Sequence, residues 1–163
     1  MFRVLSFVLV LVTSAWSMPA AAAEYESKEL ADAARDYRQD LLDRVQPNKR
    51  QPNLIPRLRK DADEEYRAKR YDRAIDDLEK AISYGADDGL VWLRLAQAQV
   101  ANSGDDHAMA SAYNAYRKST DPVERGNALF VIGREYDRHD KYKEALAAFE
   151  AGVGSTQSEG VTT

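Results

Sequence analysis

The chain has 163 residues, of which 31% are charged, and its formal net charge is −4 at pH 7. Basic and acidic residues are interspersed, so no segment presents the basic field that attracts nucleic acid or an anionic membrane, and we expect neither partner. The absence of cysteine excludes disulfides and a lipid-modified cysteine, which leaves packing alone to hold the fold together.

Residues 1–23 are typical of a secretory signal peptide. Arg3 precedes an apolar run at 4–12, and Ala21 and Ala23 occupy the two small-residue positions before a cleavage site. The alternative is an uncleaved membrane anchor, but the run is shorter than the roughly 20 apolar residues that span a bilayer. We therefore expect an exported, periplasmic protein that is not inserted in the membrane once the signal peptide is removed.

An amphipathic helix is predicted at residues 24–46, with Ser27 as its N-cap, and a proline-containing linker follows at 47–53. Apolar residues recur at three- and four-residue spacing and form one helix face: Leu30, Ala33, Ala34, Tyr37, Leu41 and Val45. We interpret this helix as a cap that shields the open end of a helical stack. A coiled-coil or partner-binding helix is the alternative.

From residue 54 onward the helices are expected in three pairs. The predicted ranges are 55–68 with 71–83, 90–101 with 105–118, and 122–138 with 142–153. Residues 154–163 contain almost no apolar side chains, so they cannot offset the entropy of ordering and are predicted to form a disordered tail.

Capping residues mark where several of these helices begin. Asp87 or Asp88 is suited to cap the helix that follows, and Asp105 is suited to cap the next one. Residues 121–124 place an N-cap aspartate, a proline and a capping-box glutamate in order, which is a strong start signal.

The same two-helix pattern occurs three times along the chain. Leu58 stands 34 residues before Trp92, and Trp92 stands 37 residues before Leu129. Two small residues keep a constant separation of 12 in each copy: Ala62 with Ala74, Ala96 with Ala108, and Gly133 with Ala145. Small residues allow two helices to approach closely, and a period in this range predicts a repeat array in which each unit packs on the next.

These copies resemble the tetratricopeptide repeat (TPR) family over about residues 55–153. The third copy matches best, with Leu129, Ile132, Gly133, Tyr136, Tyr142, Ala145, Phe149 and Gly152. The second copy supplies Trp92, Leu95, Ala96, Ala108 and Ala115, and the first supplies Ala62, Tyr71, Ala74, Leu78 and Ala81. Asp61 and Ala112 depart from the family pattern. The resemblance implies an all-α, right-handed α-solenoid of three TPR-like helix hairpins, with repeats at 55–88, 89–125 and 126–153, preceded by the N-terminal capping helix.

The resemblance also implies a concave groove that the first helix of each pair lines and that holds a protein or peptide partner. The groove set, matched residue to residue, is Arg59, Lys60, Asp63, Arg67, Leu93, Arg94, Gln97, Ala101, Asn127, Phe130, Arg134 and Arg138. Six of the set are basic, so one hypothesis is an acidic segment or a C-terminal carboxylate as partner. The alternative is a solvated charged face that Asp63, Asp137 and the second helices neutralise.

No residue pattern indicates catalysis. His107 and His139, the two histidines, stand at predicted turns without carboxylates at metal-ligand spacing. A Gly-rich phosphate loop and a nucleophile motif are both absent from the sequence. We therefore predict a protein that is not an enzyme and that holds no metal and no cofactor.

The sequence thus predicts an exported TPR adaptor or scaffold that binds a protein or peptide. The alternative is the N-terminal interaction module of a larger cell-envelope protein, because the chain also has a faint resemblance to the helical N-terminal extensions of bacterial alpha-2-macroglobulin-like proteins. A third class, a carbohydrate-handling enzyme on a helical scaffold, requires two facing carboxylates in a deep pocket, and the sequence offers none. The oligomeric state is not predicted.

Overall fold

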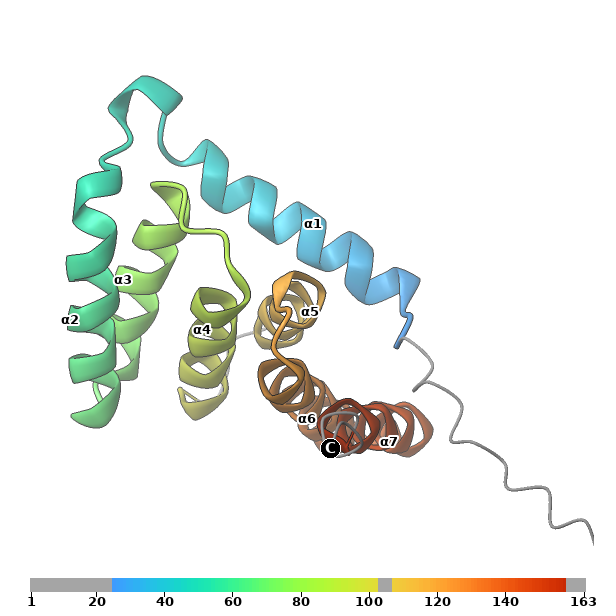
Figure 1. Ribbon diagram of the computed structural model, residues 1–163. Coiled ribbons are helices and arrows are strands. Elements are labelled where there is room, and N and C mark those ends of the chain that lie inside the picture. The colour runs from blue at the N-terminus through green and yellow to red at the C-terminus, as the bar shows by residue number, and fades with distance from the viewer. Residues whose placement is uncertain (1–24, 103–106, 158–163) are drawn as a thin grey trace, which may run out of the picture.

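A computed structural model of the chain describes residues 25–102 and 107–157 (Figure 1). Within these two ranges the secondary structure is helical throughout, which confirms the all-α class. The elements in chain order are α1 (Lys28–Asp43), η1 (Pro47–Lys49), η2 (Pro52–Leu54), α2 (Ile55–Arg67), α3 (Tyr71–Ser83), α4 (Gly89–Ala101), α5 (Ala108–Lys118), α6 (Pro122–Arg138) and α7 (Tyr142–Gln157). None of these helices is long and apolar enough to cross a membrane.

Some predictions lie outside the described residues. These are the signal peptide at 1–23, the Asp105 cap and the part of the predicted tail at 158–163. Helix α5 begins at Ala108, directly after His107.

Helix α7 continues beyond its predicted end, so the prediction of a disordered tail is wrong for residues 154–157. The hydroxyl of Ser155 donates a hydrogen bond to the carbonyl of Ala151 at 3.0 Å, which satisfies both groups within the last turns. Thr156 lies close against Gly126 of α6, where an added Cβ would be 2.6 Å from its methyl group. Contact with α6 therefore supports the last turn of a sequence that is too polar to form helix by itself.

Helix α1 lies along the sides of α3 and α5 and does not cover an end of the helix row (Figure 1). Its N-cap is Ser27, as predicted, and the Ser27 hydroxyl accepts a hydrogen bond from the Leu30 amide at 3.3 Å. The buried face of α1 consists of Leu30, Ala34, Tyr37 and Leu41. The interpretation of α1 as an end cap is therefore wrong, because its apolar face is covered by the second helices of the first two hairpins.

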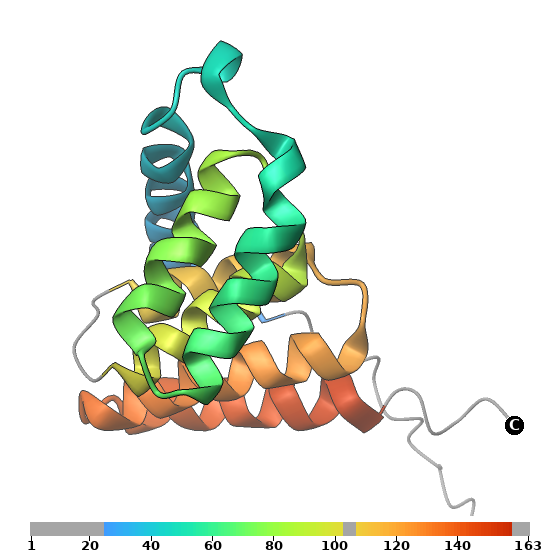
Figure 2. The same cartoon turned by 90° about the vertical axis from the view of Figure 1, so that its left-hand side faces the viewer.

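Helices α2 to α7 form three hairpins in a row, and each helix packs against the next one in the sequence. The helix direction turns along this row. Figure 2 shows α2 and α3 upright while α6 and α7 lie across them at the other end. This rotation follows from packing ridges into grooves at an angle, which prevents successive hairpins from stacking in parallel.

Small residues of the repeated pattern lie in the core between helices. Ala74 and Ala96 are fully buried, as is the much larger Trp92. At Gly133 an added Cβ would lie 2.5 Å from the Phe149 ring, so only glycine permits this approach of α6 to α7. The small residues of the repeated pattern are thus buried, and at Gly133 the contact is with Phe149.

The two adjacent aspartates before α4 have different roles. Asp88 is the N-cap of α4, accepts a hydrogen bond from the Val91 amide at 3.2 Å and pairs with Arg59 of α2, whereas Asp87 binds side chains of α1, α4 and α5. At α6 the predicted N-cap, Asp121, is confirmed, with the Val123 amide 2.7 Å from its carboxylate.

The capping-box glutamate of α6 does not reach back to the amide of Asp121. That amide donates to the hydroxyl of Ser119 at 3.1 Å, and the same hydroxyl donates to Glu124 at 2.6 Å. The hydroxyl of Ser119 thus bridges Glu124 and the Asp121 amide, which would bond directly in a capping box. This bridge connects the end of α5 to the start of α6.

The turns that close the first and third hairpins have the same geometry. Lys69 and Asp140, which occupy equivalent repeat positions, have left-handed φ angles of 60° and 58°. In both turns the next amide donates to the carbonyl five residues earlier at 2.9 Å, from Arg70 to Glu65 and from Lys141 to Tyr136. This is the Schellman pattern of a helix C-terminus, in which glycine is the preferred left-handed residue.

We expect Lys69→Gly to stabilise the protein by about 0.5–1 kcal/mol, because glycine removes the cost of a left-handed φ. Lys69→Ala is the matched control, since it shortens the side chain but keeps the unfavourable φ, and it should not stabilise the fold. The measurement is the free energy of unfolding in urea. Equal stabilisation by both variants would contradict the assigned turn geometry.

Candidate binding site between α1 and α5

A cleft of about 440 Å³ opens between α1 and α5. Its lining comes from the polar edge of α1, from the facing side of α5 and from the segment before α1. The lining residues are Glu26, Ala31, Ala34, Arg35, Arg38, Tyr113, Asn114, Arg117 and Lys118. Four of these side chains are cations and one is a carboxylate, so the cleft is basic.

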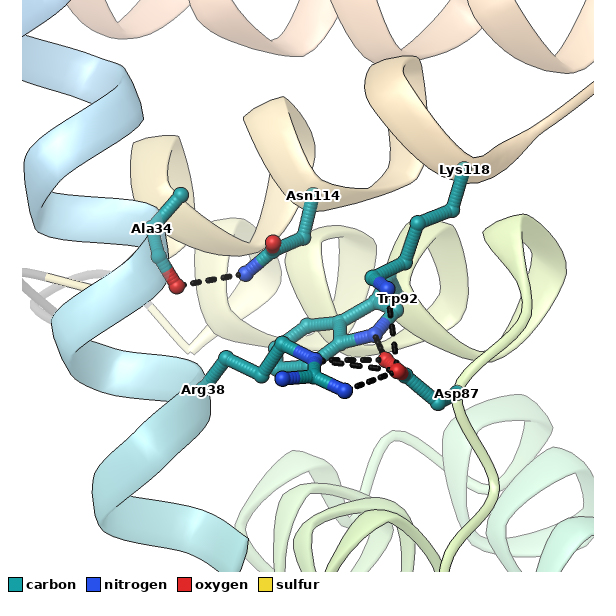
Figure 3. A network of polar contacts seen from close by, with 6 residues as sticks. All are labelled: Ala34, Arg38, Asp87, Trp92, Asn114 and Lys118. Carbon is teal, nitrogen blue, oxygen red and sulfur yellow. Dashed lines mark hydrogen bonds and ion pairs between the residues drawn. The ribbon is translucent and has the colours of Figure 1, made fainter.

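Asp87 forms hydrogen bonds to three of the helices around this cleft. It accepts hydrogen bonds from Arg38 Nε at 2.9 Å, from Lys118 Nζ at 2.9 Å and from Trp92 Nε1 at 2.9 Å (Figure 3). These three donors belong to α1, α5 and α4, whereas Asp87 belongs to the loop before α4. One carboxylate therefore determines how three helices lie relative to one another.

The Asp87 carboxyl remains ionised because of these donors. Burial by itself raises its pKa, but the hydrogen bonds from Arg38, Trp92 and Lys118 outweigh that effect and hold the pKa below its usual range. Arg38 and Lys118 thus share a single negative charge, and this leaves an excess of positive charge at the mouth of the cleft.

A second contact fixes the backbone of α1 on α5. The buried Asn114 amide donates a hydrogen bond to the carbonyl of Ala34 at 2.9 Å (Figure 3). Because this carbonyl belongs to the middle of α1, the bond sets the position of the helix along its own axis. The cleft therefore lies between two helices that are held together and does not depend on a mobile element.

Two further cations stand on the rim of the cleft, where they contact solvent. Arg35 is 70% exposed and lies 3.0 Å from Asp32 and 3.3 Å from Asp36. Arg117 lies 3.5 Å from the exposed carboxylate of Glu26. Exposed ion pairs of this kind are weak and readily exchanged, so an incoming carboxylate can compete for both guanidinium groups.

The first-helix surface that was predicted as a groove is largely neutralised within the chain. Arg59 is paired with Asp88, and Arg94 lies 3.7 Å from Asp63 and donates to Gln97 at 3.2 Å. In the same surface Lys60 is paired with Glu64 and Arg138 with Glu135. These contacts support the alternative interpretation of a solvated charged face.

One member of the predicted groove set is misplaced. Leu93 is 3% exposed and belongs to the core, so the prediction that it faces a groove is wrong. The following hairpin covers it. Ala101 is half-buried at the end of α4, and the other members of the set, Arg67, Asn127, Phe130 and Arg134, are exposed on α2 and α6.

The cleft residues were not found from the sequence because α1 is outside the repeated pattern. Periodicity identified the apolar face of α1 but could not show which helices would cover it. The sequence did contain one indication of this site, the adjacent aspartates Asp87 and Asp88. A helix has one N-cap, so only one of the two was needed there, and the other was free to contact a different helix.

Neither histidine belongs to a metal site in the described part of the chain. His107 and His139 are exposed, and the His107 ring stacks on the Tyr37 ring with centroids 4.1 Å apart. Within residues 25–102 and 107–157 no three His, Asp or Glu side chains converge in a way that could hold a metal ion.

Comparison of the chain with protein-family models, with curated proteins and with solved structures found no match. The TPR resemblance therefore stays a prediction that depends on repeat spacing. What the site can do is inferred from its own geometry, which is a basic cleft on a fixed pair of helices.

We expect Asp87→Asn to destabilise the protein by about 2 kcal/mol, because Arg38 and Lys118 would lose the charge that compensates them. The asparagine oxygen would still accept the Trp92 hydrogen bond, so the loss of stability measures the contribution of the negative charge. Asp36→Asn, which removes an exposed carboxylate from α1, is the control and should change stability little. The free energy of unfolding in urea measures both, and equal effects would contradict the assigned role of Asp87.

The same carboxyl predicts an acid-dependent loss of stability. A pKa that is lower in the folded state contributes stability above the unfolded pKa of about 3.9 and loses it as the pH falls through the folded value. The stability difference between wild type and Asp87→Asn should therefore be constant down to about pH 5 and shrink as the pH falls below about 4. Urea unfolding across this pH range measures it, and a difference that stays the same size from about pH 5 to about pH 2 would contradict the lowered pKa.

Proposed function

We propose that this chain is an exported scaffold of the TPR type that binds an acidic peptide segment of a protein partner in the cleft between α1 and α5. The observation that carries the proposal is the charge of the cleft, where four cations and one carboxylate surround about 440 Å³. Guanidinium groups pair with carboxylates through two parallel hydrogen bonds, which gives both strength and orientation.

The location of the cations favours the cleft over the first-helix surface. In the cleft two cations share Asp87, and the pairs of Arg35 and Arg117 are exposed. On the first-helix surface Arg59 and Arg94 each have a carboxylate of their own from a neighbouring element. The four cations of the cleft also surround one volume, so an acidic segment can contact several of them at once.

Two observations support the repeat assignment and the exported location. The first and third hairpins close with the same left-handed turn, at Lys69 and Asp140, as expected when one structural unit is repeated. The pattern of a positive residue, an apolar run and a small-residue exit at 1–23 supports export to the periplasm. A repeat scaffold with a basic cleft is suited to binding a partner, and this role does not require catalysis.

The test is binding of a fluorescent hexaglutamate peptide, measured by polarisation, with hexaglutamine as the uncharged probe. Reversing both rim charges, in Arg35→Glu with Arg117→Glu, should weaken hexaglutamate binding about tenfold, since two attractions become repulsions. These side chains are largely exposed, so the fold should be retained, and circular dichroism checks this.

Arg94→Glu is the matched control, because it reverses an equally exposed arginine on α4 outside the cleft. It should leave the affinity for hexaglutamate unchanged. Loss of binding in Arg94→Glu with retention in the cleft variant would place the partner on the first-helix surface. Absence of binding to wild type, or equal binding of hexaglutamine, would overturn the proposed function.

A further inference from the structure

Apolar side chains are exposed at the α7 end of the helix row. Phe130 of α6 is 39% exposed, and Leu146 and Val153 of α7 are 57% and 42% exposed. Phe149 lies beside them, with its ring centroid 5.8 Å from that of Phe130. These four residues form one surface, which we name the α7 end face, and α7 lies at the end of the row in Figure 1.

The repeat register explains why these positions are apolar. The residues 37 positions earlier than Phe130 and Val153 are Leu93 and Tyr116, which are 3% and 1% exposed. In the second hairpin these positions are covered because α6 packs against α4 and α5. The α7 end face therefore has the composition of a stacking surface, but the described chain places no further hairpin on it.

The opposite end of the row has a different composition. In α4, the side that faces the preceding hairpin is apolar and buried, with Val91, Leu95 and Ala98. The residues 34 positions earlier, on the outer side of α2, are charged: Arg57, Asp61 and Glu64. Charged outer faces terminate repeat arrays, so the α2 end does not offer a matching surface to the α7 end face of another copy.

Two charges of opposite sign stand next to the apolar residues of the α7 end face. Arg134 follows Phe130 by one turn of α6, and Glu150 follows Leu146 by one turn of α7. Both are exposed, and neither forms an ion pair among the described residues. In a two-fold contact the same surface meets itself, so a cation on one helix can meet the anion on the partner's other helix.

We propose that a second copy of this chain docks on the α7 end face, so that two helix rows meet through α6 and α7 about a two-fold axis. The apolar residues supply the buried centre of this contact, and Arg134 of each copy faces Glu150 of the other. A second copy fits because it brings both the same apolar surface and the complementary charges. The charged α2 end stops the assembly at two copies.

The experiment is sedimentation equilibrium of the purified protein over a range of concentrations. Wild type should be a dimer, and Leu146→Glu should be a monomer because it buries a charge at the centre of the contact. Leu90→Glu is the matched control, since Leu90 is a similarly exposed leucine on α4, outside the α7 end face. This control should remain a dimer.

Charge exchange separates a second copy from any other occupant. Arg134→Glu and Glu150→Arg should each weaken self-association about tenfold, since each puts like charges together, and the double variant should restore it. Mixing the two single variants should yield a heterodimer. A monomeric wild type, a dimer that Leu146→Glu does not dissociate, or a double variant that stays monomeric would each overturn the proposal. Hexaglutamate binding, which uses residues of α1 and α5, is expected to be unaffected by these substitutions.

Discussion

One carboxylate, Asp87, joins α1 to both α4 and α5. A largely buried negative charge is costly unless hydrogen bonds and opposite charges surround it, and Asp87 obtains them from three helices, through Arg38, Trp92 and Lys118. If α1 moved away, Asp87 would lose one of its two cations. The charge therefore selects one placement of α1 among the several that its apolar face alone would permit.

This placement decides which surfaces of the molecule are open to partners. Because α1 lies along α3 and α5, it forms the basic cleft with α5 and covers neither end of the row. On the exposed side of the first helices, several charges are already paired, as Arg94 is with Asp63. The cleft and the α7 end face are consequently separate surfaces, one basic and one apolar, suited to different kinds of contact.

The row also has a direction, which follows from how its two ends differ. Positions that are apolar and buried at Val91 and Leu95 of α4 are charged at Arg57 and Asp61 of α2. Other positions, which are buried at Leu93 and Tyr116, are apolar and exposed at Phe130 and Val153. A chain built this way cannot extend indefinitely in both directions. A helix row with one charged end and one apolar end favours a closed assembly of fixed size over open-ended stacking of copies.

The sequence by itself determined the helices, several of their N-caps and the close approach within hairpins, because these depend on neighbours a few residues away. Helix α6 begins and ends at the predicted residues, since the Asp121 cap is a local signal. Only the tertiary structure decided where α1 packs and which of Asp87 and Asp88 contacts α1 and α5. It also decided that Leu93 is buried while the equivalent Phe130 is exposed, because burial depends on whether another hairpin follows, and no local pattern records that.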